Sequence, residues 1–187
     1  MIPNLPTNLP PVPVLHTERL VLRGHTASDF ADVHALWSDP QVVEFITGKP
    51  STQLESQVRL LRYIGHWAAY GFGYWHVEEK HTGDSVGDVG FGALKRDMTP
   101  PVSGEPEIGW VLATRHHGKG YATEAARAVL GWGDKHFGST GTFCIFHPDN
   151  LGSIRVGEKL GFTFSHTAQY MGGDTPVYVR QAGREKR

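Results

Sequence analysis

Two glycines and four basic or potentially basic side chains stand directly before an alanine-rich segment, in Arg115-His116-His117-Gly118-Lys119-Gly120-Tyr121-Ala122. The residues up to Leu112 have strand character and those from Tyr121 have helical spacing, so the glycines lie where a strand turns into a helix. The first N–H groups of a helix lack internal partners, and the helix dipole adds partial positive charge there. Because Gly118 and Gly120 have no Cβ, they can take left-handed conformations and let a ligand approach the backbone. The pattern therefore favours binding of an anion such as a phosphate.

The glycine spacing alone is also typical of a simple turn. A P-loop is excluded, because Tyr121 rather than Ser or Thr follows Gly120 and no glycine stands at the required earlier offset. A dinucleotide fingerprint is excluded as well, because Thr123 occupies the place of its third glycine and the chain does not open with a βαβ pattern. These failures argue against a kinase or ATPase that binds a nucleotide phosphate.

The longer run is more specific than its glycines. The segment EIGWVLATRHHGKGYATEA, followed by NLGSIRVGEKLGF, closely resembles the GNAT superfamily of acyl-CoA-dependent N-acetyltransferases. Residues 115–120 match the Q/R-x-x-G-x-G/A pattern of that family, and Asn150 with Ser153 and Gly161-Phe162 match the helix that follows. With TERLVLR and the early SDP, the resemblance covers nearly all of residues 16–180. It is strongest to the branch that includes the ribosomal-protein N-terminal acetyltransferases.

The resemblance implies acetyl transfer from acetyl-CoA, as co-substrate, to a primary amine by direct attack in a ternary complex. The amine would be a protein N-terminus or a small molecule, and the loop amides would bind the pyrophosphate of coenzyme A. Backbone groups of Val111 and Leu112 would bind pantetheine like an added strand. The cofactor-binding residues that we expect are Val111, Leu112, Arg115, His116, His117, Gly118, Lys119, Gly120, Tyr121, Ala122, Asn150 and Ser153.

Gly109 lies in the middle of a predicted strand, where glycine marks a bulge or a close backbone approach. In the family, a bulge on this strand splays it from its neighbour and makes room for pantetheine. Strand alternation puts Glu107 on the face of Gly109 and Val111. An amine attacks a thioester only when neutral, so a base must take its proton, and Glu107 is the candidate. The alternative is that Glu107 pairs with a basic residue near the start of the strand.

Asn150 and Ser153 lie near the first turn of the later helix. Asn150 is a natural N-cap, and the resemblance adds a hydrogen bond from its side chain to the pantetheine arm. Ser153 is the candidate acid that protonates the departing thiolate, although a serine in a first turn often only makes a local hydrogen bond. Many family members carry a tyrosine four residues before the Gly-Phe pair, where this chain has Gly157. We expect that a glycine is needed here because another group passes close to this position, and the pantetheine arm is the candidate for that group.

The eleven histidines do not form a metal motif, since His116 and His117 are adjacent and point in different directions, and no H-E-x-x-H or cysteine pair is present. We therefore expect no metal, and assign Arg115, His116, His117 and Lys119 to a positive field that attracts phosphates.

Periodicity gives the elements that must position these residues. In the first helix Ser28 is the expected N-cap. In the second, the expected apolar stripe consists of Leu54, Val58, Leu61 and either Ile64 or Tyr63. The predicted order is a strand over 18–26, a helix from about 28 with a shorter one after Pro40, a helix over 52–69, a hairpin over 72–96 that turns at 82–84, a strand over 106–112, a helix over 121–137, a strand over 142–147, a helix over 151–160, and strands over 163–171 and 176–180. This order indicates an α/β fold of the α+β type, with a mixed, mostly antiparallel sheet of about six or seven strands and about four helices on its faces.

With 187 residues and a formal net charge of −1, the chain fits one domain and has no broad cationic face for nucleic acid. We expect a Pro-rich extended segment over 1–14, an N-acetyltransferase domain over 15–181 and a frayed tail over 182–187. Cys144 has apolar neighbours and is expected to be a buried strand thiol. Neither a signal sequence nor a membrane span is evident, which favours a cytoplasmic protein.

Two matters stay open at this point. A non-catalytic acyl-CoA-binding or sensory domain with the same fold is the alternative to an enzyme. The amine acceptor is also undetermined, because similar scaffolds serve protein N-termini, amino acids, polyamines and amino sugars. A homodimer is compatible with the sequence.

Overall fold

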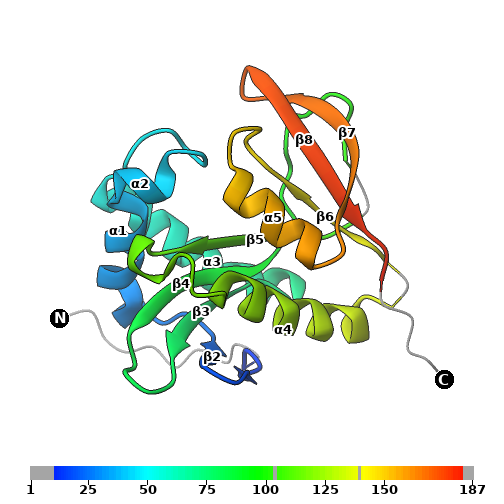
Figure 1. Ribbon diagram of the computed structural model, residues 1–187. Helices are drawn as coiled ribbons and strands as arrows, with labels where there is room; N and C mark the ends of the chain where they lie inside the picture. Colours follow the sequence, from blue (N-terminus) through cyan, green and yellow to red (C-terminus); the bar gives the residue numbers. More distant parts are fainter. Residues whose placement is uncertain (1–10, 103–104, 139, 183–187) are drawn as a thin grey trace.

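The computed structural model describes residues 11–102, 105–138 and 140–182, and they form one twisted sheet flanked by helices (Figure 1). The strand order is β1-β2-β3-β4-β5-β6-β8-β7, and every neighbouring pair is antiparallel except β5 and β6. The strands are β1 (Leu15–His16), β2 (Leu20–Arg23), β3 (Tyr74–Glu79), β4 (Ser85–Gly92), β5 (Glu107–Leu112), β6 (Thr142–Ile145), β7 (Thr163–Tyr170) and β8 (Gly173–Arg180).

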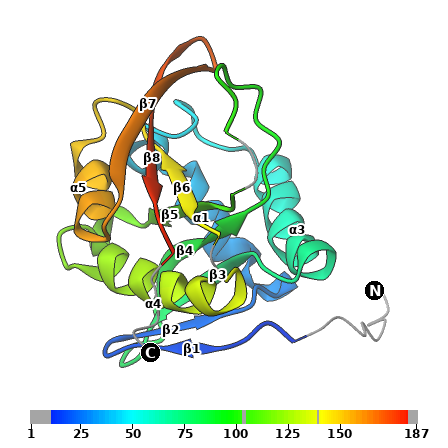
Figure 2. The same cartoon turned by 90° about the vertical axis from the view of Figure 1, so that its right-hand side faces the viewer.

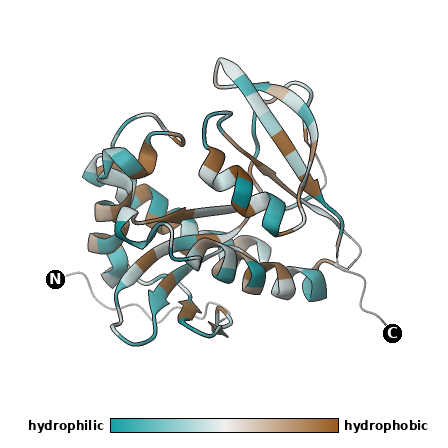
Figure 3. Ribbon diagram, viewed as in Figure 1, coloured by the Kyte–Doolittle hydropathy of each residue, from teal (hydrophilic) through white to brown (hydrophobic). Residues whose placement is uncertain are grey.

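Helices lie on both faces of the sheet (Figure 2). On one face, helix residues including Trp37 and Leu60 pack with Val111 of β5; on the other, α4 packs with Ile108 and Leu112 of the same strand. The helices are α1 (Phe30–Ser38), α2 (Pro40–Val43), α3 (Gln53–Tyr70), α4 (Tyr121–His136) and α5 (Leu151–Lys159), with single 3₁₀ turns at Ala27–Asp29 and Thr114–His116. Hydrophobic and hydrophilic residues alternate along α4 and α5 (Figure 3), as one-sided packing on a sheet requires.

The mixed, mostly antiparallel fold is confirmed, and the order of the main elements is as expected. The sheet has eight strands rather than six or seven, and the described residues include five α-helices rather than four. The extra strand, β1, is only two residues long and pairs Leu15 with Leu22. Such a short strand has no period for a sequence pattern to reveal.

The expected N-cap of the first helix is wrong. Ser28 lies inside the 3₁₀ turn, and Asp29 is the residue that precedes α1. The Asp29 carboxylate accepts a 2.7 Å hydrogen bond from the amide of Thr26 and forms an ion pair with Arg23. Asp29 is therefore held by partners on both sides, whereas the Ser28 hydroxyl contacts only the Thr26 hydroxyl.

The expected apolar stripe of the second helix is wrong in part, because, of its residues, only Tyr63 is buried and Ile64 is half-buried. Leu54, Val58 and Leu61 of α3 are 57–68% exposed. A second helical stripe faces the sheet instead, and its buried residues are Ser56, Leu60, Tyr63 and Trp67. Both stripes satisfy the helical period, so periodicity alone could not choose between them.

The sheet opens between β5 and β6. These parallel strands are in register at a single pair, Glu107 with Phe143, and diverge beyond it (Figure 1). Cys144 on β6 is buried as predicted, and burial raises the pKa of its thiol. The splay leaves one edge of β5 without a strand partner along most of its length.

The ends of the expected domain are described only in part. Residues 11–14 drape over the core, where Val12 packs on the main cluster and the Pro13 carbonyl accepts a 2.7 Å hydrogen bond from the Trp75 indole. The remainder of the predicted Pro-rich segment, residues 1–10, and most of the predicted tail, 183–187, lie outside the described residues. Within the described residues, every helix is too short or too polar to span a bilayer.

Candidate active site

The glycine loop ends at the N-terminus of α4, as expected. Gly118 and Gly120 have φ values of 75° and 82°, in the left-handed region that glycine adopts without strain. The amide of Glu124 donates to the Gly120 carbonyl at 3.1 Å, so the helical ladder begins there. The amides of residues 120–123 consequently have no helical acceptor. Those of 118 and 119 have no hydrogen-bond acceptor among the described residues either, so the six amides form a group of donors at the positive end of the dipole.

Residues distant in the sequence hold this loop in place. The Glu124 carboxylate binds the side chain and the amide of Arg19 at 2.7 and 2.8 Å, together with the hydroxyl of Thr17. The Arg19 guanidinium also donates to the Lys119 carbonyl at 3.0 Å and lies 4.5 Å from the ring centre of Tyr121. The TERL segment thus braces the loop, a role that its sequence did not reveal.

The basic side chains of the loop differ in what they can contribute. His116 is buried, and burial lowers the pKa of its imidazole, so it is neutral at pH 7 and does not add to the expected positive field. The ring of His117 bonds to the Leu112 carbonyl at 2.8 Å, and Arg115 donates to the Ser85 carbonyl. Lys119 is exposed and is the loop cation without a recorded side-chain partner among the described residues.

The open edge of β5 leads from this loop into the sheet. The Ala113 amide donates to Val86 on β4, whereas the Pro106 carbonyl accepts from Phe143 on β6. Because backbone groups alternate in direction along a strand, Trp110 and Leu112 face the open edge and Val111 faces β4. Leu112 and Val111 were expected to bind pantetheine through their backbone. The alternation favours Leu112 for this role, but it favours Trp110 in place of Val111.

The expected bulge on this strand is wrong, because the β4–β5 register runs without a shift from Glu107 to Leu112. The extra residue lies on β4, where the β3–β4 register skips Val86. Gly109 instead marks a close approach: a Cβ there would lie 2.2 Å from the Tyr74 hydroxyl. Burial and the nearby Glu107 carboxylate raise the pKa of Tyr74, so its phenol stays protonated.

A cavity of about 940 Å³ opens between β5, α3 and the start of α5. Its walls include the predicted catalytic residues Glu107 and Ser153, together with Asn150 and Val111. The loop residues 114–122 do not line it, so the site has two parts, which meet at the end of β5.

Glu107 is buried, and each of its oxygens accepts a hydrogen bond from Arg96, at 2.5 and 2.7 Å. The ion pair considered as the alternative to catalysis is therefore present. The ion pair leaves the carboxylate able to accept more hydrogen bonds, because each oxygen keeps a further lone pair for water or an amine. Arg96 also donates to the Tyr170 hydroxyl at 2.6 Å, which joins β5 to the distant β7. No signal in the sequence identified Arg96.

Asn150 is the N-cap of α5, since its side-chain oxygen accepts a 3.1 Å hydrogen bond from the Ser153 amide. The Asn150 amide group remains free to bind a ligand. The Ser153 hydroxyl has no recorded partner among the described residues and borders the cavity.

A close neighbour accounts for Gly157, as expected, but the candidate for that neighbour was wrong. A Cβ at this position would lie 2.9 Å from the Phe146 ring and 3.8 Å from Phe162. Gly157 is buried, so the close neighbour is an aromatic side chain at the end of β6 rather than pantetheine. The ring of Phe146 fills space beside the helix that a larger side chain would need.

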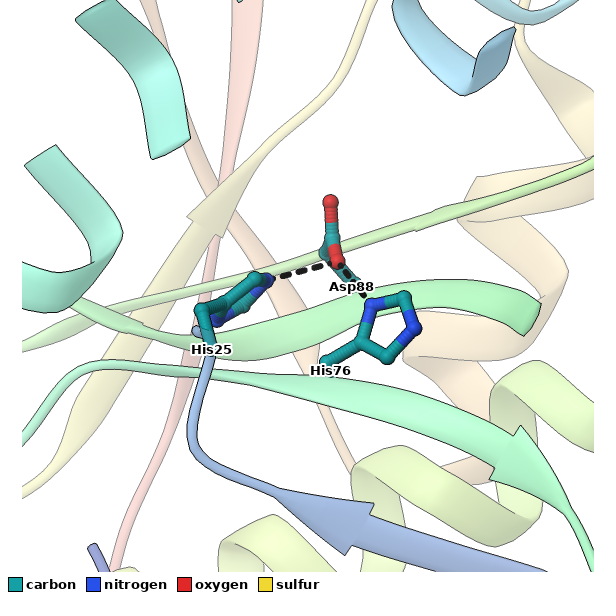
Figure 4. Close-up of side chains that lie close together, drawn as sticks. All are labelled: His25, His76 and Asp88. Atoms are coloured by element: carbon teal, nitrogen blue, oxygen red, sulfur yellow. Dashed lines mark hydrogen bonds and ion pairs between the residues drawn. The ribbon is translucent and has the colours of Figure 1, made fainter. Parts of the chain in front are cut away.

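A polar cluster that the sequence did not predict lies beside the cavity (Figure 4). One oxygen of Asp88 is 2.9 Å from the His25 ring and 3.3 Å from the His76 ring, and all three side chains are buried. His25 packs on Tyr63 with ring centroids 4.6 Å apart, and Tyr63 on Tyr74 at 5.0 Å. The cluster thus supports the two tyrosines that line the cavity.

The same three residues offer ligand atoms within 4.8 Å of one another, as a metal site would. Metal-bound histidines normally donate their second ring N–H to an acceptor. Here the outer ring nitrogens of His25 and His76 have no recorded partner. The geometry fits a hydrogen-bonded cluster better than a metal centre.

Comparisons with known proteins agree with this architecture. A family model described as an acetyltransferase (GNAT) domain matches residues 19–163. The chain is 33% identical over 172 residues to YkkB, an uncharacterized protein of Bacillus subtilis, with 90% of this chain and 95% of that protein covered. It is similar to the crystal structure of an acetyltransferase from Agrobacterium tumefaciens, with 27% identity, a TM-score of 0.78, and 95% and 98% of the two chains covered.

A third similarity concerns the fold alone. RimL, a ribosomal L7/L12 alpha-N-protein acetyltransferase solved in complex with coenzyme A, shares 16% identity with this chain. Its TM-score is 0.74, and 90% of this chain and 98% of that chain are covered.

Proposed function

Because the chain belongs to the acetyltransferase (GNAT) domain family, we propose that it transfers the acetyl group of acetyl-CoA to a primary amine. One observation carries this proposal: the open edge of β5 runs directly to the free amides at the N-terminus of α4. The edge suits an extended chain that carries amide groups, and the amides suit a diphosphate. Pantetheine and pyrophosphate occur in this order in coenzyme A.

The residues at both parts of the site fit acetyl-CoA. Amides 118–123 and Lys119 would bind the pyrophosphate, and the backbone of Trp110 and Leu112 would bind the pantetheine amides. The free amide group of Asn150 would bind the same arm from the side of α5. Bound there, acetyl-CoA supplies an activated acyl group to the cavity that contains Glu107.

Within the cavity, Glu107 would take the proton of the attacking amine through a water molecule. The amine is otherwise protonated at neutral pH, with a pKa of about 7.7–8.0 at an N-terminus and about 10.4 on lysine. A carbon–nitrogen bond forms, the carbon–sulfur bond breaks, and the departing thiolate takes a proton from water, either directly or through the Ser153 hydroxyl, which passes on its own proton and regains one from water. Because the thiol has a pKa of about 8.5, its thiolate is a weak base and departs with little help from an acid.

The alternative is a domain that binds acyl-CoA without turnover. Both proteins would bind acetyl-CoA in a calorimetric titration, so binding does not separate them. The test is release of free coenzyme A thiol in the presence of a panel of amines: peptides with free N-termini, amino acids, polyamines and amino sugars. We expect release with at least one class. Binding without release from any class would favour the sensory domain, and absence of binding would contradict both.

The name of RimL makes protein N-termini one class to include in the panel. Mass spectrometry of the product would place the new acetyl group on the amine and exclude simple hydrolysis of the thioester. Hydrolysis would release thiol without any acetylated product.

A further inference from the structure

The α3 wall of the cavity carries an unbalanced positive charge. Arg59, Arg62, Tyr63 and His66 line the cavity and lie on one side of the helix, at i, i+3, i+4 and i+7. His66 is satisfied internally, because its two ring nitrogens bond to the Phe72 carbonyl and the Ala93 amide. Neither Arg59 nor Arg62 has a carboxylate partner among the described residues.

The other half-buried arginines of the described chain are paired. Arg23, Arg96 and Arg180 each bind a carboxylate at 2.5–2.8 Å. Arg59 is equally withdrawn from solvent, and burial lowers the pKa of its guanidinium. An arginine remains charged even so, which leaves a cation partly removed from water without a counter-ion. Such a group is costly unless an anion joins it.

Arg59 is also held in one orientation. Its guanidinium lies 3.6 Å from the ring centre of Trp37 and donates to the Ser51 hydroxyl at 3.1 Å. Its Nε is buried without a hydrogen-bond partner among the described residues, so the terminal Nη groups are the ones that can meet a ligand in the cavity. The stacked plane and the free N–H groups match the two oxygens of a carboxylate.

The charges of the cavity are arranged along its length. Trp37, on which Arg59 stacks, packs with Val111 at one end of β5, and Glu107 lies at the other end. Four residues of strand separate the two, about 13 Å at a rise of about 3.3 Å per residue. Glu107 and Arg59 both line the cavity. The space between them suits a compact acceptor with an ammonium at one end and a carboxylate at the other.

We propose that Arg59, assisted by Arg62, binds a carboxylate that the amine acceptor carries close to its reacting nitrogen. This inference rests on the proposed acetyl transfer and narrows its substrate class. Two sources have the required chemistry: a free amino acid, and a peptide with an acidic residue next to its N-terminus.

Matched acceptors test the proposal. The rate constant kcat/KM is measured for free L-amino acids, for the same amino acids as carboxamides, and for dipeptide amides with Asp or Asn in second place. A bidentate, charge-assisted contact contributes about 1.5–3 kcal/mol, so the acid should exceed its uncharged partner roughly 10- to 150-fold. Preference for the free amino acids would identify a small-molecule acceptor, and preference for the Asp dipeptides a peptide N-terminus.

Three variants assign the preference to a residue. Arg59→Met keeps apolar contact with Trp37 and should bring the ratio of acid to amide close to one, whereas Arg59→Lys should retain part of it. Lys135→Met removes the same charge from the last turn of α4, outside the cavity, and should leave the ratio unchanged. Melting temperatures are compared so that loss of preference is read only from folded variants. A full preference in Arg59→Met would overturn the proposal, and so would equal rates for acid and amide in the parent.

A binding measurement separates this inference from the proposed function. The same acids and amides are titrated calorimetrically into parent and Arg59→Met with coenzyme A present, a step that needs no turnover. Binding of the acid alone, lost in the variant, would support the carboxylate site even if no amine were acetylated. Absence of any difference between acid and amide in the parent would overturn it, even if amines were acetylated.

Discussion

The loop before α4 and the cavity beside β5 are built from different parts of the chain. The loop offers backbone amides from six consecutive residues, 118–123, and each donor is within three positions of Gly118 or Gly120. The cavity offers side chains, and its Arg96–Glu107 pair joins a strand to a loop eleven positions away. A backbone site depends on local conformation, whereas a side-chain site depends on which distant elements meet.

Substitutions in the two regions should therefore affect different properties of the protein. A residue in the loop matters through the space and the φ angle that it allows, so binding of acetyl-CoA should respond. A residue in the cavity matters through its functional group, so the rate or the acceptor preference should respond while acetyl-CoA still binds.

The largest effect is expected for Gly120→Val. A branched side chain at φ 82° is strained, and it blocks the approach of a phosphate to the free amides. Loss of two charge-assisted hydrogen bonds, each about 2 kcal/mol, weakens acetyl-CoA binding roughly a thousandfold. Calorimetry measures the affinity. Gly138→Val is the control, since Gly138 has φ 62° and open space around it at the other end of α4. Parent-like binding by Gly120→Val would remove the loop from the site.

Glu107→Gln tests the opposite half of the comparison. The amide cannot accept the amine proton, so the rate should fall roughly 10²–10³-fold, most strongly at low pH, where more of the amine is protonated. Acetyl-CoA affinity should stay within about twofold. A pH–rate profile records both effects. If rate and profile both match the parent, Glu107 serves only to pair with Arg96.

Asp88→Asn tests whether the buried cluster supports the cavity from behind. Burial raises the pKa of Asp88, but His25 and His76 outweigh this and lower it to about 2. Burial likewise lowers the pKa of His76, and Asp88 outweighs it, so that pKa is raised. The variant should lose about 3 kcal/mol of unfolding free energy, because two buried rings lose their charged acceptor.

The pH dependence of that loss has a definite sign. The contribution of Asp88 is present above its unfolded pKa of about 3.9 and is lost as the pH falls towards 2. The contribution of His76 is present below about 6.5 and is lost as the pH rises through its raised pKa. The difference between parent and variant in urea unfolding should therefore peak between about pH 4 and 6.5. A difference that is constant with pH would show that packing, rather than charge, accounts for it.

Ser153→Ala should reduce turnover roughly ten- to a hundredfold, near the low end of acid–base contributions, with little change in acetyl-CoA affinity. Its amide still reaches Asn150, so the helix cap is kept. Asn150→Ala gives the contrasting result, because it removes the cap and costs about 1 kcal/mol of stability. Full activity in Ser153→Ala would assign protonation of the thiolate to water.

The smallest effect is expected for Arg19→Met, which removes the brace of the loop but none of its amides. Acetyl-CoA affinity should fall about fivefold, the scale of one lost hydrogen bond, while kcat is retained. Arg180→Met breaks a similar two-bond ion pair, with Asp134, away from the loop. Equal affinity in both variants would show that the loop needs no brace.

The sequence reveals the loop and much of the fold because their signals are local. Gly118 and Gly120 have the predicted left-handed angles, and the helix that follows begins at Tyr121 as its spacing indicates. The partners of the cavity residues could not be predicted from the sequence, since nothing near Glu107 in the chain indicates that it pairs with Arg96. The same limit explains Gly157, whose neighbour Phe146 directly follows β6. Sequence patterns indicate which residues share one face of a helix or strand, but not which faces of different elements pack against each other.

The single registered pair between β5 and β6 bears on how the protein avoids self-association. An unpaired strand edge is a template on which another chain can add a strand, and long exposed edges lead to aggregation. Here the free edge of β5 is turned inward, beside α5 and the cavity, rather than outward at the rim of the sheet. The outer rims are the two-residue β1 and the strand β7, which carries a register shift between Phe164 and His166. The vacant edge inside the sheet is thus accessible to a slender ligand but offers little room for a strand from a second copy of the chain.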